Sequence, residues 1–413
     1  MTQKIYEQGD VKVTLLEIKS RANGGKIQVL DQVKGVFIYE DMTQPTMMAE
    51  FKFDDRINLL HDLPIVGEED ITIEFVTPGL RPVTMTFQTT SLEGLAVQDN
   101  VKGHVYTIKA VSKEHFVSAR NNIRHSFRGT IDEMVDNIIT TYMESSKPRE
   151  IDPCKGNQTM VVPFLPPLVA IDMLRKRAVH SSYPSSAFVF FENQDGFNFK
   201  CLESFLSKKD PGTRIFNYAD DTTSDSTAEA RSFRTILEYE DVSRVDTNLR
   251  IEMGGLYAKV RSYDFIKKKT DTIDVKYDEK FPGFEKSDSK NKDQITSSTL
   301  KEHGQDPATQ YFVPRDSSAN ENYIPDMIGQ RMMFTSFMNQ QTIRVLINGD
   351  SALKVGQIIE LNLPEPTGTT GRKKEMKLTS GLYLIKTLCH IITIGGKNKH
   401  NISMDCVKLG YSI

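Results

Sequence analysis

The sequence predicts a mainly β protein with α+β insertions, in which two related antiparallel β barrels are built from one chain. Three observations lead to this fold class. Apolar and polar residues alternate over most of residues 12–118, as they do in strands with one buried face. A helical period interrupts the alternation between residues 119 and 205. The alternation then returns and is clearest in the last 75 residues, where two segments resemble earlier ones.

Residues 1–118 are expected to form the first barrel. The segments VFIYED, MAEFKFD, ITIEF, VTMTFQ and HVYTIKAVS alternate with a period of two residues, and Pro, Gly and Asp turns separate them. Short strands at this spacing are typical of a closed or nearly closed antiparallel sheet.

Residues 119–205 are expected to form an α/β insertion behind this barrel. The segment IDEMVDNIITTYM places its apolar residues on one stripe of a helix. Thr130 and Glu133 stand at the spacing of a capping box, in which each side chain satisfies an unpaired amide of the first turn. FVFFENQDGFNF reads as a β hairpin whose Asp-Gly pair supplies the turn.

A second helix of the insertion is expected to begin at the Pro166-Pro167 pair, because proline fits the first helical turn. It continues as LVAIDMLRKRAV and closes with Arg175, Lys176 and Arg177. This basic triplet has two interpretations. It could bind a phosphate group, or it could simply favour the exposed carbonyls at the end of the helix.

Beyond residue 205 the strand signals resume in RTILEYED, LRIEM, GLYAKVRSYDF and DTIDVKY, and then lapse between about residues 284 and 322. A further helix, DMIGQRMMFTSFMNQQ, precedes the final strands. We therefore expect residues 206–275 and 340–413 to complete the second barrel. Residues 276–339 are expected to form an irregular insertion with a helix.

Two pairs of segments suggest that the barrels arose by duplication. VGEEDITIEFVTPG and VGQIIELNLPEPTG both run from a Val-Gly turn into an alternating strand. HVYTIKAVS and GLYLIKTLC follow them in the same order and match Tyr106 to Tyr383. The pairs predict that residues 66–112 and 355–389 form equivalent strands of the two barrels.

Composition argues against several classes of protein. The chain has 38% hydrophobic and 26% charged residues and a net charge of −3, so attraction of the whole molecule to nucleic acid or to an anionic membrane is not implied. The N-terminus lacks the apolar stretch of an export signal, and prolines break the most apolar run, VVPFLPPLVAIDML. We expect a soluble protein without a membrane anchor.

No motif for catalysis, a cofactor or a metal is found in the sequence. The four cysteines form no CxxC pair, the eight histidines show no HExxH spacing, and no GxGxxG or GxxxxGK[ST] loop is present. Cys389 and His390 are adjacent, but neighbours on a strand point to opposite faces and cannot share a proton. The sequence therefore predicts no enzyme, no cofactor and no metal site.

The order of parts resembles that of the central baseplate hub protein of contractile-tailed bacteriophages, a family that also contains the head domain of type VI secretion spike proteins. The resemblance covers nearly the whole chain. Its most specific pieces are FDDRINLLHDLPIVGEEDITIEFVTPG, PPLVAIDMLRKRAVHSSYPSSAFVFFENQDGFNF, VGQIIELNLPEP and SGLYLIKTLCHIITIGGKNKHNISMDCVKLG. It implies two tube-type barrels per chain and a homotrimer, in which six similar barrels join a hexameric tail tube to a trimeric central spike.

The resemblance also implies partners and a location. The partners are a separate spike protein, because the chain has no stalk repeats, and a tail tube or tube-initiator ring, with baseplate wedge and tape-measure proteins nearby. The protein would be assembled in the cytoplasm of a host bacterium, lie in the tail baseplate of the virion, and touch passing DNA without specificity.

Three alternatives to this function remain open. The chain could be a tail-tube initiator or tube-like protein, which normally has one barrel. It could be a baseplate-associated cell-wall hydrolase, which would cleave cell wall. It could also be a general nucleic-acid-binding protein, whose binding would depend strongly on salt.

One loop is a candidate contact with a partner. In PEPTGTTGRKKEMKLTS, residues 364–380, the side chains of Arg372, Lys373, Lys374 and Lys377 are opposed only by one glutamate. The loop is either a solvated surface loop or a basic arm that docks on an acidic neighbour in the tail.

Overall fold

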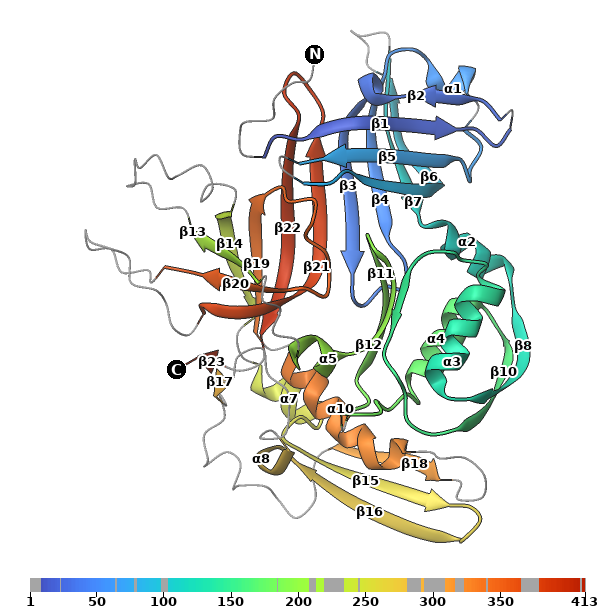
Figure 1. Ribbon diagram of the computed structural model, residues 1–413, viewed down its shortest axis with the longest axis vertical. Coiled ribbons are helices and arrows are strands. Elements are labelled where there is room, and N and C mark those ends of the chain that lie inside the picture. The colour runs from blue at the N-terminus through green and yellow to red at the C-terminus, as the bar shows by residue number, and fades with distance from the viewer. Residues whose placement is uncertain are drawn as a thin grey trace.

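The computed structural model describes most of the chain as two β barrels, an insertion with helices, and a separate small sheet (Figure 1). The described residues are 9–22, 24–63, 65–77, 80–97, 103–183, 185–207, 213–218, 234–243, 246–280, 291–292, 309–315, 323–338, 341–364, 379–408 and 411–412.

The first barrel is an antiparallel sheet with the strand order β1-β5-β6-β7-β4-β3, and a short β2 lies beside β1. Its alternating inward residues, such as Phe51, Phe75 and Ile108, form one buried apolar cluster. The strands are β1 (Lys12–Lys19), β2 (Lys26–Gln28), β3 (Val33–Asp41), β4 (Met48–Asp55), β5 (Asp70–Val76), β6 (Val83–Val97) and β7 (His104–Val111). Two short helices accompany them, η1 (Leu30–Gln32) and α1 (Leu59–Asp62).

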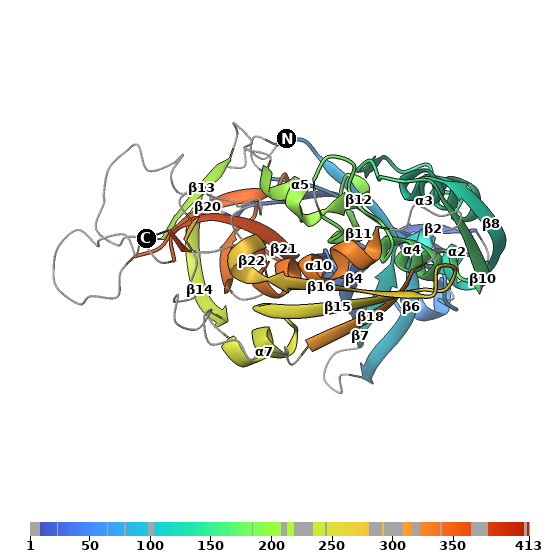
Figure 2. The ribbon, with the colours of Figure 1, turned by 90° about the horizontal axis from the view of Figure 1, so that it is seen from below.

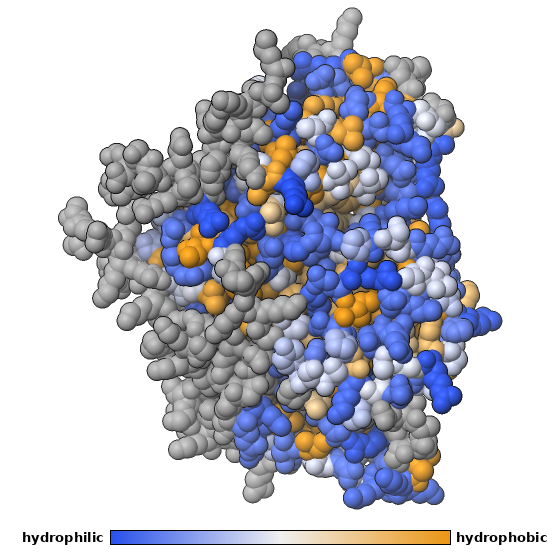
Figure 3. Space-filling view, viewed as in Figure 1, coloured by the Kyte–Doolittle hydropathy of each residue, from blue (hydrophilic) through white to orange (hydrophobic). Residues whose placement is uncertain are grey.

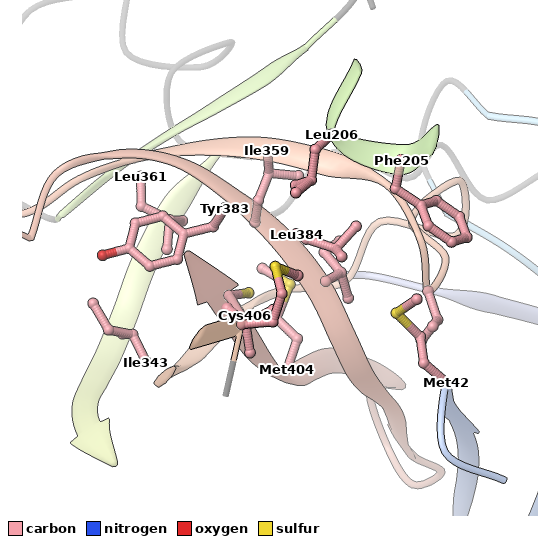
Figure 4. Close-up of a cluster of buried hydrophobic side chains, with 14 of the residues drawn as sticks. Met42, Phe205, Leu206, Ile343, Ile359, Leu361, Tyr383, Leu384, Met404 and Cys406 are labelled. Carbon is pink, nitrogen blue, oxygen red and sulfur yellow. The ribbon is translucent and has the colours of Figure 1, made fainter. Parts of the chain in front are cut away.

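The second barrel closes on itself in the order β21-β20-β13-β14-β19-β22, with β22 pairing again to β21. Figure 4 shows side chains such as Tyr383, Ile343 and Cys406 converging in its core. The strands are β13 (Arg214–Tyr218), β14 (Thr235–Ser243), β19 (Gln341–Asn348), β20 (Ile358–Asn362), β21 (Gly381–Thr393) and β22 (Lys399–Lys408). The predicted antiparallel pairing is found except at β13, which runs parallel to both β14 and β20.

The two barrels share one strand order. When the six main strands of each barrel are numbered along the chain, both sheets read 1-4-5-6-3-2. β5 and β20, which follow the two Val-Gly turns, are both the fourth strand. The predicted equivalence of Tyr106 and Tyr383 is wrong, because Tyr106 lies on β7, the sixth strand, and Tyr383 on β21, the fifth. Half-buried strands use few residue types, so a short match does not identify the position of a strand in a barrel.

A long hairpin formed by β21 and β22 belongs to both barrels. The second half of β21 pairs with β3 of the first barrel, from Thr387 opposite Asp41 to Thr393 opposite Gly35. On the other side, Lys399 of β22 bridges to Asp10 just before β1. The hairpin tip thus fills the gap between β3 and β1, and the first barrel is closed by strands of the second (Figure 1).

The insertion packs beside the barrels around its own apolar cluster. The predicted first helix is present as α3 with its π-helical continuation η2, and the capping box of Thr130 and Glu133 is formed. The second helix, α4, begins at Pro167 as predicted, and Gly196 has a φ of 128° in the predicted hairpin turn. The elements are α2 (Lys113–Arg120), β8 (Ile123–Gly129), α3 (Ile131–Asn137), η2 (Ile138–Tyr142), β9 (Arg149–Ile151), β10 (Gln158–Leu165), α4 (Pro167–Arg175), β11 (Phe188–Asn193), β12 (Gly196–Cys201) and α5 (Leu202–Ser207).

A separate three-stranded sheet, β16-β15-β18, lies at the end of the molecule away from the first barrel and packs against α10 (Figures 1 and 2). The prediction that residues 206–275 complete the second barrel is therefore wrong for 257–275. These alternating residues pack against α10, and their buried Val260 and Val275 continue the apolar cluster of the barrel core. The elements are α7 (Thr247–Glu252), β15 (Tyr257–Asp264), β16 (Lys269–Lys276), α8 (Tyr277–Lys280), β18 (Thr309–Arg315) and α10 (Ile324–Met338). A two-stranded pair is made by β17 (Asn291–Lys292) and β23 (Tyr411–Ser412).

Candidate functional site

The junction of the two barrels contains a buried pair of histidines. His390 on β21 and His400 on β22 are both 0% exposed, and their Nδ1 and Nε2 atoms are 3.0 Å apart. The ring of Phe75 from β5 packs edge-on against both imidazoles, with centroids 5.8 and 5.5 Å away. Burial lowers the pKa of His390 to about 4 and that of His400 well below its ordinary value. Both rings are therefore neutral near pH 7, and the N–H of one ring donates a hydrogen bond to the bare nitrogen of the other.

Glu40, at the end of β3, fastens three parts of the molecule together. Its two carboxyl oxygens each accept a backbone N–H, one from Gln194 in the insertion hairpin and one from Val355 before β20, both at 2.9 Å. The side chain is 1% exposed, and burial raises its pKa to about 8 despite these two hydrogen bonds.

A second polar contact links the insertion to the first barrel. Lys147 donates to Glu114 and to Glu192, at 2.6 Å each. Glu192 also accepts from the backbone N–H of Met47 at 3.0 Å. Both carboxylates are buried, and burying a charged carboxylate without a partner costs desolvation energy. The ion pairs with Lys147 offset part of this cost. These contacts hold the insertion in one orientation on the barrels.

Cys389 and His390 point to opposite faces of β21, as expected for neighbours on a strand. The imidazole of His390 faces His400 inside the sheet, whereas the thiol of Cys389 lies near Tyr39 on the other face, where burial raises its pKa to about 12. Within the described part of the chain, no cluster of three or more His, Cys, Asp or Glu side chains could hold a metal ion. None of the described helices is long and apolar enough to cross a membrane.

Two members of the basic triplet at the end of α4, Arg175 and Lys176, form ion pairs within the chain. Arg175 and Lys176 both pair with Asp172, one turn earlier, and Arg175 donates to the carbonyl of Phe188 at 3.0 Å. Arg331 of α10 donates to the carbonyl of Lys176 at 2.9 Å. These contacts favour the interpretation in which the triplet ends the helix. They argue against the interpretation in which it binds phosphate.

Two cavities lie where the insertion meets the second barrel. One is mainly apolar, has a volume of about 540 Å³, and is lined by residues of α4, α10, β21 and the turn after β3. The other, of about 320 Å³, is lined by four cations. Each of these cations has a carboxylate partner, in the pairs Arg149–Asp136, Lys200–Glu150, Arg214–Asp350 and Lys354–Asp195. The second cavity therefore offers little net charge to an anion.

The predicted partner-contact loop cannot be placed. Arg372, Lys373, Lys374 and Lys377 lie outside the described residues, so their prediction stays a prediction.

Two exposed surfaces of opposite charge were not predicted from the sequence. We call the turn between β15 and β16 the basic tip, and it comprises Phe265, Ile266, Lys267, Lys268 and Lys269. We call the exposed stretch of β14 the acidic strand, and it comprises Glu238, Tyr239, Glu240, Asp241 and Val242. All ten side chains are exposed. The letters FIKKK and EYEDV show the like charges in the sequence, but they do not show that these side chains are exposed.

The fold of this chain is shared with tail proteins of known structure. The tail protein from Neisseria meningitidis MC58 matches with a TM-score of 0.57 and 8% sequence identity, covering 95% of this chain and 96% of that one. The prophage MuSo2 43 kDa tail protein from Shewanella oneidensis matches with a TM-score of 0.55 and 10% identity, covering 95% of this chain and 98% of that one.

No protein-family model matches the sequence, and no curated protein does. At these low identities the likeness concerns the fold alone. It agrees with the predicted mainly β architecture of two barrels with insertions, and it extends over almost the full length of both tail proteins.

Proposed function

We propose that this chain is a structural hub of a contractile phage tail, a homotrimer that joins the hexameric tail tube to a trimeric central spike and forms part of the channel for DNA. One observation carries the proposal. The two barrels have the same strand order and are fused through a shared hairpin. Three such chains contain six related barrels, and these can face a sixfold partner while the ring keeps threefold symmetry for a spike.

The rigidity of the junction supports this role. An adaptor must hold its two barrels at a fixed angle, since six positions on one ring have to match one partner. The hairpin joins both sheets by main-chain hydrogen bonds, and Glu40 links the insertion hairpin to the second barrel. Relative motion of the barrels would break these buried bonds, which is costly.

The likeness to two tail proteins supports the broader part of the proposal, a structural role in the phage tail. We propose accordingly that the protein lies in the baseplate of the virion after assembly in the host cytoplasm, beside the spike and the tube or its initiator ring. We also propose that residues 1–118 and 119–205 act as the first barrel and its insertion.

The oligomeric state and one activity assay test the proposal. Light scattering of the purified chain should give three copies per particle, and added peptidoglycan should stay uncleaved. A hexamer would favour a tube or tube-initiator protein. Release of soluble cell-wall fragments would favour the hydrolase.

A further inference from the structure

The basic tip is held in a defined shape. Asp264 at its base is 3% exposed, and its Oδ1 atom accepts the backbone N–H groups of Ile266 and Lys267 at 2.9 and 3.0 Å. The N–H of Phe265 donates to the carbonyl of Arg315 on β18 at 3.3 Å. The turn is therefore fixed in advance, and a partner that binds it does not have to order it.

The tip presents apolar and cationic groups together. Phe265 and Ile266 are 61% and 60% exposed at its vertex, and the Tyr263 ring packs edge-on against Phe265 at 5.3 Å. Three lysines follow directly. The Nζ atom of Lys269 lies 3.4 Å from Oδ1 of Asp271. These two adjacent, bulky apolar side chains stay exposed to water until another surface covers them.

The acidic strand has matching chemistry. Its three carboxylates, Glu238, Glu240 and Asp241, are interleaved with Tyr239 and Val242, which are 37% and 46% exposed. β14 pairs with β19 along most of its length, but its pairing with β13 covers only Thr235 and Ile236. Beyond that point no described strand pairs with this edge of β14. Glu240 lies 3.8 Å from Arg344 on β19, and its side chain is still 69% exposed. The strand thus presents exposed carboxylates and two exposed apolar side chains to a neighbour.

The two surfaces lie on opposite sides of the molecule. Figures 1 and 2 place β14 at one side and the turn between β15 and β16 at the other in two perpendicular views. A chain whose complementary surfaces lie on different sides forms head-to-tail contacts, and such contacts close into a ring when the rotation between copies fits. One chain cannot bring its own tip to its own strand.

We propose that, in the ring, the basic tip of one copy docks on the acidic strand of the next copy. This inference rests on the proposed trimer and names the contact that closes it. The lysines of the tip then face the carboxylates of the strand, and Phe265 and Ile266 cover the exposed Tyr239 and Val242. The face seen in Figure 3 is mainly hydrophilic with small, separate hydrophobic groups. Because these apolar groups are small and separate, charge complementarity sets the orientation of docking and speeds association.

Charge exchange tests the contact. The variant Lys267→Glu/Lys268→Glu and the variant Glu238→Lys/Glu240→Lys should each weaken the trimer about tenfold at low salt, measured as the concentration at which sedimentation velocity shows half of the chains as monomers. The variant that combines all four changes should return close to the wild-type value. As a matched control, Lys12→Glu/Lys113→Glu reverses two exposed lysines outside both surfaces and should leave the trimer unchanged.

Four outcomes overturn the proposal. If both reversed variants form trimers as the wild type does, the contact lies elsewhere and the trimer itself stands. If the combined variant stays dissociated, the two surfaces do not face each other. If the tip variant loses only binding to vesicles of phosphatidylserine and phosphatidylcholine, the tip meets a lipid surface. A wild-type chain that stays monomeric at every concentration removes the proposed function as well.

Discussion

His390 and His400 lie side by side in one hairpin, with 3.0 Å between Nδ1 and Nε2, and each has one ring nitrogen without a partner among the described groups. Across the hairpin, His390 lies opposite Ile402 and Ile392 lies opposite His400, so the two imidazoles are diagonal neighbours on the inner face. They stand where the hairpin passes from the second barrel into the first. A proton added here would be buried against Phe75.

This pair makes the junction sensitive to acid. Burial lowers the pKa of His390 from 6.5 to about 4, so between these values the unfolded chain binds more protons than the folded one. The contribution of His390 to the free energy of unfolding is therefore fully present above pH 6.5. It falls by about 3 kcal/mol as the pH drops toward 4. His390→Gln should lose less of its melting temperature between pH 7 and pH 4.5 than the wild type. The exposed His125→Gln serves as control, and an equal loss in all three proteins would refute the prediction.

Glu40 has the opposite dependence on pH. Its pKa rises from 4.5 to about 8 on folding, so the folded chain holds the extra proton between these values. The contribution of this residue to stability is complete below pH 4.5 and is lost as the pH rises toward 8, by about 5 kcal/mol at most. Glu40→Gln leaves one backbone N–H without an acceptor and is destabilising. The difference in melting temperature from the wild type should shrink between pH 5 and pH 8.5, and a constant difference would contradict the assignment.

The shared hairpin should couple the barrels energetically. Ile392 belongs to the C-terminal hairpin but is 0% exposed in the core of the first barrel. Ile392→Ala should cost about 2–5 kcal/mol and reduce hydrogen-exchange protection in β5, far away in the sequence. Thr393→Ala, at the exposed neighbouring position, should change neither. Unchanged protection in β5 of the Ile392 variant would mean that the first barrel closes without the hairpin.

Gly349 gives a steric test of the same junction. A Cβ atom at this position would lie 2.1 Å from Cγ and Nδ1 of His400, whereas a Cβ at Gly395 in the hairpin turn would meet nothing within 4 Å. Gly349→Ala should lower the melting temperature strongly or prevent folding, because the ring it meets is buried and cannot move aside. Gly395→Ala should be close to neutral. Similar melting temperatures for both variants would show that the histidine can be displaced.

The sequence predicted the local structure better than the long-range pairing. The helix at residues 131–142, its capping box, and the turn at Gly196 depend on residues a few positions apart, and all three are present. β15 was assigned to the wrong sheet, because an alternating strand that packs on a helix looks the same as one that packs in a barrel. Local pattern does not say which surface covers a strand.

The junction of the two barrels could be predicted from the sequence only in part. Gly395 and Gly396 lie in the hairpin turn, and counting outward from these two glycines in the sequence places His390 and His400 on one face. The contacts of the hairpin with β3 and of Glu40 with Val355 join residues more than 300 positions apart, and no local pattern encodes them. The acidic strand and the basic tip became visible only once exposure was known.

An electron cryo-microscopy reconstruction of the purified chain tests the central claim most directly. The account predicts a threefold ring around one channel, in which the first and second barrels alternate at six similar positions and the basic tip of each copy contacts the acidic strand of the next. A sixfold ring that presents one barrel type at every position, or particles that contain a single chain, would contradict it.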